Sequence, residues 1–268
     1  MNDQKFNIAV LIDGDNAQAK LIKEIIEEVS KYGKATIRRI YGDWTSNQMN
    51  SWKEIINQYS INPIQKFSYT TGKNSTDSSL IIDAMDILHG QNVDGFCIVS
   101  SDSDYTGLAK RIREEGLFVM GIGHRTTPIA FVNSCEIFTF AENLLLDAEL
   151  TDVKAEEKTG VKKVETTHSK PKKASLKTIE KPEVKHEAKV RFPRLDISII
   201  DKAFEISTNE EDEAFIAKVG SSLRKIDPSF DSRTYGFKTL TQLIKSIDKY
   251  TIVKNEVNGL NHPLVKLK

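Results

Sequence analysis

Hydrophobic residues between positions 5 and 148 follow two alternating patterns, one typical of β-strands and one typical of amphipathic helices. Short runs rich in β-branched residues predict strands over residues 6–13, 36–41, 62–69, 96–101, 117–122 and 137–140. Apolar positions at helical spacing predict helices over residues 17–32, 50–59, 77–89 and 105–115. Strands that alternate with helices indicate right-handed βαβ units, so we expect an α/β domain with a mainly parallel sheet over residues 1–150.

This pattern stops after Leu150. Residues 151–189 contain many Lys, Glu, Thr and Pro residues and no Phe, Trp or Tyr. Such a segment cannot bury enough apolar surface to offset the entropy that ordering would cost, so residues 151–190 are predicted to form a disordered, Lys-rich linker. The linker either acts as a solvated tether or also touches phosphates non-specifically.

The hydrophobic pattern resumes at Phe192 and continues to the end of the chain. It predicts helices over residues 197–206, 213–225 and 238–246, followed by strands over 250–253 and 264–267. The dipeptide Asn258-Gly259 lies between these strands and is a turn signal. Three helices followed by a hairpin are the outline of a winged helix, so we expect a small α+β domain over residues 191–268.

The charges of the whole chain balance, because 38 Lys and Arg residues stand against 38 Asp and Glu residues. Any attraction to a polyanion must therefore come from an uneven distribution of charge. No apolar run approaches the roughly 18 residues that span a bilayer, and the N-terminus does not have the pattern of a signal peptide. Cys97 and Cys135 lie in apolar runs without metal-ligand spacing. We therefore expect a cytoplasmic protein with reduced cysteines and no membrane partner.

Carboxylates cluster where two of the predicted strands end. Asp13 closes the first strand, and Asp102 and Asp104 follow the strand over 96–101. Asp77 lies at the start of the helix just before that strand. Ligands of parallel α/β sheets bind beyond the carboxyl ends of the strands, so we expect these four carboxylates to lie close together.

Three or four neighbouring carboxylates without a cation would be costly, because like charges disfavour joint ionisation. Oxygen-only ligand sets suit Mg²⁺ or Mn²⁺, which activate water and stabilise the leaving oxygen of a phosphodiester. Structural alternatives remain open, since Asp77 or Asp104 would also serve as a helix N-cap. Asn16 is either a turn residue or an amide that orients Asp13 or contacts phosphate. Asp83 and Asp86 lie further along the helix, where we expect them to face solvent.

The motifs around these acids resemble one known family. The relevant stretches are I-D-G-D-N at 12–16, K-N-S-T-D at 73–77 and V-S-S-D-S-D-Y at 99–105, with G-I-G at 121–123 and C-E-I-F at 135–138. With these, residues 5–145 resemble the NYN family, the PIN-like nucleases that include the LabA-like bacterial proteins. The resemblance implies a PIN-like fold and metal-dependent RNA hydrolysis. It puts Asp13, Asp77, Asp102 and Asp104 at the acidic metal-site positions, with Asn16 beside them.

The C-terminal segment contains the run F-D-S-R-T-Y-G-F at 230–237, followed by Lys238. This run resembles the OST-HTH (LOTUS) domain, which implies RNA binding or, in some members, docking of a protein partner. Arg233 and Lys238 are candidates for phosphate contacts, and Tyr235 is a candidate for stacking on a base. The structural alternatives are a salt bridge for Arg233 and core packing for Tyr235.

Together these features predict an endoribonuclease that recruits RNA through its C-terminal domain and cleaves it at the acidic centre. Asp13, Asp77 and Asp102 would hold Mg²⁺ or Mn²⁺, and Asp104 would be a further ligand or a base that orients water. Lys73, in the loop before Asp77, is a candidate for gripping a substrate phosphate. The main alternative is a non-catalytic RNA-binding adaptor. A DNA or nucleotide phosphatase is a third interpretation, which would gain little from the C-terminal domain.

Overall fold

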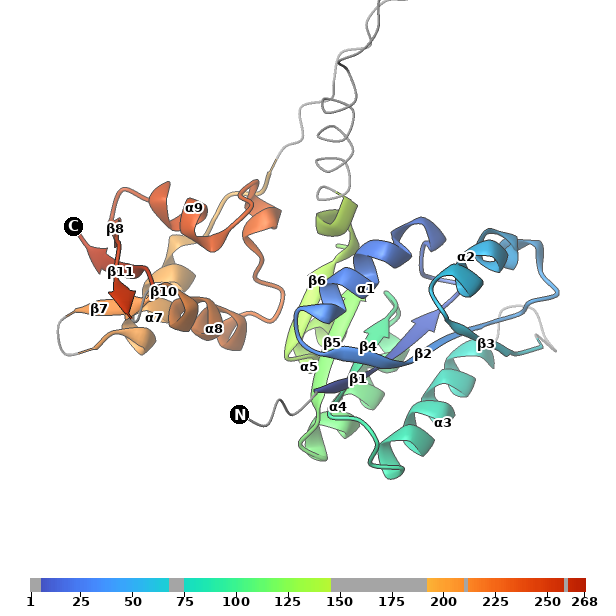
Figure 1. Cartoon of the computed structure of the whole chain (residues 1–268). Helices are drawn as coiled ribbons and strands as arrows, with labels where there is room; N and C mark the ends of the chain where they lie inside the picture. Colours follow the sequence, from blue (N-terminus) through green and yellow to red (C-terminus); the bar gives the residue numbers. More distant parts are fainter. Residues whose placement is uncertain (1–5, 68–74, 146–191, 210–211, 258–259) are drawn as a thin grey trace, which may run out of the picture.

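The N-terminal half of the chain is built on a six-stranded parallel sheet, shown in the computed structural model of Figure 1. The structure describes residues 6–67, 75–145, 192–209, 212–257 and 260–268. The strands are β1 (Asn7–Asp13), β2 (Lys34–Gly42), β3 (Asn62–Gln65), β4 (Gly95–Val99), β5 (Phe118–Gly123) and β6 (Ile137–Phe140). Their order is β3-β2-β1-β4-β5-β6, and every neighbouring pair is parallel. The expected α/β fold with a parallel sheet is confirmed.

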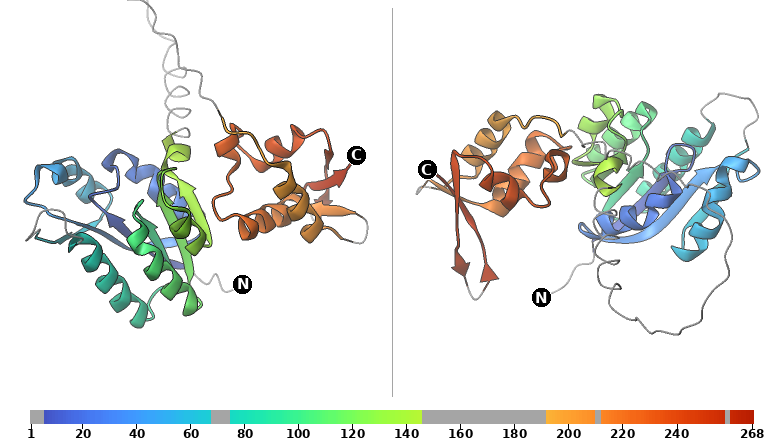
Figure 2. Two further views of the ribbon diagram at one scale, coloured as in Figure 1. Left: turned by 180° about the vertical axis from the view of Figure 1, so that it is seen from behind. Right: turned by 90° about the horizontal axis from the view of Figure 1, so that it is seen from above.

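Helices cover both faces of this sheet (Figure 2). They are α1 (Ile22–Ser30), α2 (Lys53–Gln58), α3 (Ser75–His89), α4 (Thr106–Glu114) and α5 (Ile129–Ser134), and short 3₁₀ turns precede α1, α2 and α4. Alternate residues of β1 point to opposite faces, so Ile8 and Val10 pack in a core with α1, whereas Ala9 and Leu11 pack in a core with α3 and α4. Burial on both faces explains why the central strands read as continuous apolar runs.

The C-terminal segment forms a smaller α+β unit with its own core. Its helices are α7 (Ile197–Ser207), α8 (Ile216–Ile226) and α9 (Leu240–Lys245), and a 3₁₀ turn, η4 (Ser232–Tyr235), precedes α9. Strands β7 (Glu213–Phe215), β8 (Tyr250–Val253) and β11 (Leu264–Leu267) form an antiparallel sheet in the order β7-β11-β8. A short antiparallel pair, β9 (Glu256–Val257) and β10 (Leu260–Asn261), completes the unit. The expected α+β class is confirmed.

Two elements differ from the sequence-based expectations. The helix expected over residues 213–225 begins only at Ile216, because residues 213–215 form β7 and pair with β11. The short helix α5 was not expected, and its six residues are too few to display helical periodicity. The expected linker over residues 151–190 and the turn dipeptide Asn258-Gly259 lie outside the described residues. In the part of the chain that is described, no helix has the length and apolar character needed to cross a membrane.

The two units contact each other along the β6 edge of the parallel sheet. The backbone N–H of Phe138 in β6 donates to the carbonyl oxygen of Pro228 over 2.8 Å. The side-chain amide of Asn143 donates to the hydroxyl of Thr234 over 2.9 Å, and both residues are buried. The second unit thus covers the edge strand β6 and satisfies a backbone donor that would otherwise be open.

Candidate functional site

Three carboxylates gather at the carboxyl end of the sheet, where the strand order reverses between β1 and β4. Asp77, Asp102 and Asp104 each offer an oxygen atom, and these oxygens all lie within 4.8 Å of one another. Asp77 comes from the first turn of α3, and Asp102 and Asp104 come from the segment that follows β4. Asp77 and Asp102 are half-buried and Asp104 is exposed, so the cluster opens to solvent on one side.

Asp13 lies beside this trio but is completely buried, with an exposed fraction of 0%. Its carboxylate accepts hydrogen bonds from the Asn16 side-chain amide at 2.7 Å, the Ser100 hydroxyl at 2.9 Å and the Asp15 backbone N–H at 3.1 Å. These donors compensate for the loss of water. Asp13 therefore ties the loop after β1 to the end of β4, and Asn16 serves to orient it. We refer to Asp13 and the trio together as the acidic centre.

The hydroxyl of Tyr105 connects Asp13 with the trio. Its oxygen lies 2.7 Å from Oδ1 of Asp77 and 3.3 Å from Oδ2 of Asp13, while the aromatic ring is buried. A phenol has one proton, so the shorter contact is the donated hydrogen bond. Tyr105 and Ser100 had no role in the sequence-based expectations, although both belong to the V-S-S-D-S-D-Y stretch that marked the site.

The surroundings of Asp13 and Asp77 in the acidic centre disfavour ionisation of these two carboxylates. Burial raises the pKa of Asp13, even though the hydrogen bonds from Asn16 and Ser100 work against it. Burial also raises the pKa of Asp77, and the negative charges of its carboxylate neighbours add to the effect, against the opposing hydrogen bond from Tyr105. A divalent cation would reverse this penalty by supplying the missing positive charge. The all-oxygen donor set fits Mg²⁺ or Mn²⁺.

Asp102 is the acid that caps a helical turn at this site, whereas Asp77 and Asp104 lie inside their helical turns. The carboxylate of Asp102 accepts a hydrogen bond from the backbone N–H of Asp104 over 3.0 Å and so caps the 3₁₀ turn Ser103–Tyr105. Asp104 lies inside that turn, and Asp77 lies inside α3, which begins at Ser75. A carboxylate has about four lone-pair positions, so capping leaves Asp102 free to bind a cation as well.

Asp83 is not the solvated residue that its place on α3 suggested. Its side chain is half-buried, forms an ion pair with Arg39 and accepts a hydrogen bond from the hydroxyl of Tyr41. Tyr41 lies on β2 directly opposite Asp13 in the sheet register. Asp83 therefore fastens the middle of α3 to the strand next to the acidic centre, whereas Asp86 is exposed as expected.

The substrate-binding candidates outside the acidic centre are separated by the fold. The Arg233 guanidinium is only 11% exposed, and it pairs with Glu28 of α1 at 3.0 Å and with Asp231 at 2.8 Å. Burial alone would lower its pKa, but the two carboxylates raise it, so the structure favours the salt-bridge alternative for this residue. Tyr235 is half-buried with its ring 5.9 Å from that of Phe230, and Lys238 is exposed. Lys73 lies outside the described residues.

One relative of the chain is the uncharacterized protein MJ0482 of Methanocaldococcus jannaschii. It is 31% identical over 120 residues, which cover 43% of this chain and 47% of the relative. The chain thus matches about half the length of that relative.

Two solved structures resemble parts of the chain. One, a protein of unknown function from Vibrio parahaemolyticus, is 18% identical with a TM-score of 0.45 and covers 53% of this chain and 96% of its own. The other, an uncharacterized protein from Nitrosomonas europaea, is 25% identical with a TM-score of 0.28 and covers 34% of this chain and 90% of its own. Both TM-scores are below 0.5, so neither likeness determines fold or function.

Family models match both structural units. The NYN domain model matches residues 7–146, which contain the whole parallel sheet and the acidic centre. The OST-HTH/LOTUS domain model matches residues 197–262, which contain α7, α8 and α9. The chain therefore belongs to the NYN domain family, and it carries a C-terminal OST-HTH/LOTUS domain.

Proposed function

We propose that this protein is a metal-dependent endoribonuclease that hydrolyses RNA at the acidic centre. The observation that carries the proposal is the convergence of Asp77, Asp102 and Asp104, whose oxygens lie within 4.8 Å at the carboxyl end of the sheet. Membership in a nuclease family agrees with that geometry. The cleft beyond the strand ends is also where parallel α/β sheets bind their ligands.

The four acids would have different tasks. Asp77 and Asp102, which are half-buried and anchored by hydrogen bonds from Tyr105 and the Asp104 backbone, would hold Mg²⁺ or Mn²⁺. A divalent ion bound there supplies positive charge that stabilises a phosphodiester under attack by water. Asp104, the exposed member of the trio, would bind the ion or orient the attacking water. Asp13 would hold the loop after β1 in place from its buried position.

RNA recruitment would fall to the C-terminal domain. Its family model supports binding of RNA, and the exposed Lys238 would contact phosphate. Arg233 would contribute indirectly, by holding the domain against α1 through Glu28.

Cleavage and binding measured in parallel test this proposal. Labelled single-stranded and structured RNAs would be incubated with Mn²⁺, Mg²⁺ or EDTA and with wild type, Asp102→Asn or Asp86→Asn. The Asp86 variant is a matched control, because this exposed carboxylate lies on α3 away from the trio. We expect Asp102→Asn to lose cleavage by about 100-fold or more while RNA affinity stays within about twofold, and Asp86→Asn to behave like wild type.

The rival function is a non-catalytic RNA-binding adaptor. An adaptor would bind RNA in EDTA and in Mn²⁺ but produce no fragments with either metal, and that result would overturn the ribonuclease proposal. Turnover of small phosphate esters without cleavage of RNA would instead indicate a phosphatase.

A further inference from the structure

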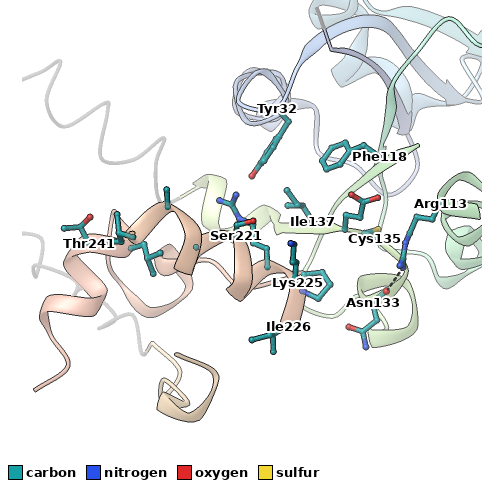
Figure 3. Close-up of a pocket in the computed structure, with 17 residues that line it drawn as sticks. Tyr32, Arg113, Phe118, Asn133, Cys135, Ile137, Ser221, Lys225, Ile226 and Thr241 are labelled. Carbon is teal, nitrogen blue, oxygen red and sulfur yellow. Dashed lines mark hydrogen bonds between the residues drawn. The ribbon is translucent and has the colours of Figure 1, made fainter. Parts of the chain in front are cut away.

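A cleft of about 950 Å³ separates the NYN domain from the OST-HTH domain (Figure 3). Tyr32, Arg113 and Phe118 line it from the NYN side, and Arg224 and Lys225 of α8 line it from the other side. A second cavity of about 270 Å³ shares Tyr32 and Arg224 with the first and adds Lys31 and Lys238. We call these two connected spaces the interdomain cleft.

The interdomain cleft concentrates positive charge in a chain whose charges balance overall. Among the described residues that line the larger cavity, Arg113, Arg224 and Lys225 are basic and Glu136 is acidic. All three basic side chains are exposed. Arg113 donates to the carbonyl oxygens of Asn133 and Ser134 and interacts electrostatically with Glu136, so Arg224 and Lys225 supply the excess positive charge of the larger cavity. The uneven charge distribution that a polyanion requires is present here.

The smaller cavity adds to this positive field. Its acidic lining residues, Glu28 and Asp231, are both paired with the Arg233 guanidinium. Lys31 also contacts Glu28, at 2.7 Å, and its side chain remains about half exposed. Lys238 lines the same cavity and is exposed. Basic groups therefore continue along the cleft in the direction of α9.

Aromatic rings lie next to these cations. The Arg224 guanidinium carbon lies 5.8 Å from the centre of the Tyr32 ring, and that ring lies 5.9 Å from the ring of Phe118. Tyr32 and Lys225 point into the space between the domains in Figure 3. A positively charged groove with aromatic faces is the combination that binds single-stranded nucleic acids, since the cations track phosphates and the rings stack on bases.

Buried polar contacts fix the two walls of the cleft relative to each other. The Glu28–Arg233 ion pair at 3.0 Å and the Asn143–Thr234 hydrogen bond at 2.9 Å are largely shielded from water. The Phe138–Pro228 backbone hydrogen bond adds a third contact between the domains. Such groups lose their partners if the domains shift, so they favour one arrangement of the cleft.

The larger cavity of the interdomain cleft is distant from the acidic centre. Phe118 and Ile137, which line the cleft, are the first residues of β5 and β6, whereas the acids lie beyond the carboxyl ends of β1 and β4. The strands between these edges have five to seven residues, which correspond to roughly 17–23 Å at about 3.3 Å per residue. Residues at the amino ends of β5 and β6 therefore lie too far from the acidic centre to contact the phosphate that is cut.

We propose that the interdomain cleft binds a single strand of RNA and anchors the substrate at a distance from the acidic centre, an inference that rests on the proposed ribonuclease function. Arg113, Arg224 and Lys225 contact backbone phosphates, and Tyr32 supplies a stacking face. Both domains contribute to this surface, so it exists only when they are docked together.

Equilibrium binding by the full chain in EDTA tests the cleft without interference from cleavage. The probe is a fluorescent single-stranded RNA of about 20 nucleotides, longer than the roughly 4–16 nucleotides that one groove usually covers. Arg224→Gln/Lys225→Gln is compared with Lys202→Gln/Lys218→Gln, which removes two exposed charges from α7 and α8 outside the cleft. Thermal unfolding is measured as well, to check that both double variants fold like wild type.

We expect the cleft variant to bind RNA about 10-fold more weakly than wild type at 0.1 M salt. The slope of log affinity against log salt concentration should become shallower by about 1.4, which corresponds to about 0.7 for each lost phosphate contact. The control variant should stay within about twofold of wild type. Equal affinities and equal salt slopes for both double variants would overturn the inference.

Binding and cleavage by the same proteins distinguish a failure of this inference from a failure of the proposed function. A wild type that binds RNA through the cleft but cuts nothing would refute the ribonuclease and leave the cleft intact. A wild type that cuts RNA while the cleft variant binds and cuts it equally well would refute the cleft alone. A cleft variant that keeps its RNA affinity but loses binding to an acidic protein segment would also refute it, in favour of a protein partner.

Discussion

At the scale of single residues, the four acids of the site differ in exposure and in hydrogen bonding. Asp13 is buried among polar donors, Asp77 accepts from Tyr105 at the border of the interior, and Asp104 reaches solvent. Burial and the neighbouring charges make the ionised form of Asp77 unfavourable in the absence of a cation. The site is thus less stable than it would be with neutral side chains, and cation binding recovers that loss.

The raised pKa of Asp77 predicts how stability depends on pH when metal is chelated. A carboxyl whose folded-state pKa is raised contributes stability below its unfolded pKa and loses it as pH rises through the folded pKa. Urea unfolding of wild type and Asp77→Asn in EDTA should therefore diverge as the pH rises above about 4, the pKa of an unfolded aspartate, with the variant more stable at higher pH. If Asp77→Asn is less stable than wild type at pH 8, that result would contradict a raised pKa of Asp77.

Tyr105 is predicted to position Asp77 for metal binding. Tyr105→Phe removes the hydroxyl that lies 2.7 Å from Asp77 and keeps the buried ring. We expect Mn²⁺ affinity, measured by electron paramagnetic resonance of the free ion, to fall by about 10-fold, as is typical for the loss of a supporting hydrogen bond. Unchanged Mn²⁺ affinity in a variant that folds normally would show that Tyr105 contributes to packing and not to the positioning of Asp77.

At the scale of elements, β2 and α3 are joined by the Asp83 contacts with Arg39 and Tyr41. This joint holds the helix whose first turn carries Asp77. Tyr41→Phe should lower the free energy of unfolding by about 1–3 kcal/mol, because the partly buried Asp83 carboxylate loses a donor. Denaturant titration measures the change. Tyr59→Phe is a suitable control, because Tyr59 is partly buried against the core that contains α1, on the opposite face of the sheet from the core of Tyr41. Equal stability of Tyr41→Phe and wild type would contradict this role.

The sequence predicts the elements of the parallel sheet well, because burial on both faces makes their hydrophobic runs continuous. The strand expected over residues 137–140 is β6 itself. By contrast, β7 is too short for a local pattern and exists through its pairing with β11, some 50 residues away in the chain. Long-range pairing of this kind leaves no periodic signal in three residues.

The acidic centre was predictable for a related reason. The ends of β1 and β4 must meet in a parallel sheet, so Asp13 and Asp102 could be placed from the strand pattern alone. The burial of Asp13, the bridge through Tyr105 and the pairing of Asp83 depend on side-chain packing between distant segments, which no local spacing reveals. The same applies to Arg233, whose partner Glu28 lies 205 positions away.

At the scale of the whole molecule, the run at 230–237 joins the two domains. Arg233 pairs with Glu28, Thr234 accepts from Asn143, and the neighbouring Pro228 accepts from β6. Residues that the resemblance associated with RNA are here partly occupied with domain docking. If the proposed function holds, this fixed arrangement of the two domains would couple recruitment of RNA to its cleavage.

Loss of the Arg233 guanidinium is predicted to loosen this arrangement. Arg233→Met removes one of the two cations that pair with the buried Glu28 and leaves Lys31, so we expect a loss of about 1–3 kcal/mol in unfolding free energy. We also expect faster cleavage by trypsin between the domains and a larger radius of gyration in X-ray scattering. Lys238→Met is the control, because it removes an exposed charge nearby. Unaltered scattering and proteolysis for Arg233→Met would contradict the docking role.

The most direct test of the ribonuclease is the single-turnover rate of RNA cleavage as a function of Mn²⁺ concentration, for wild type, Asp77→Asn and Asp86→Asn. We predict a saturable rate for wild type and for Asp86→Asn that EDTA abolishes. We expect Asp77→Asn to need at least about 10-fold more Mn²⁺ or to show no cleavage. Cleavage by wild type that persists in EDTA, or an identical Mn²⁺ dependence for Asp77→Asn and wild type, would contradict hydrolysis at the acidic centre.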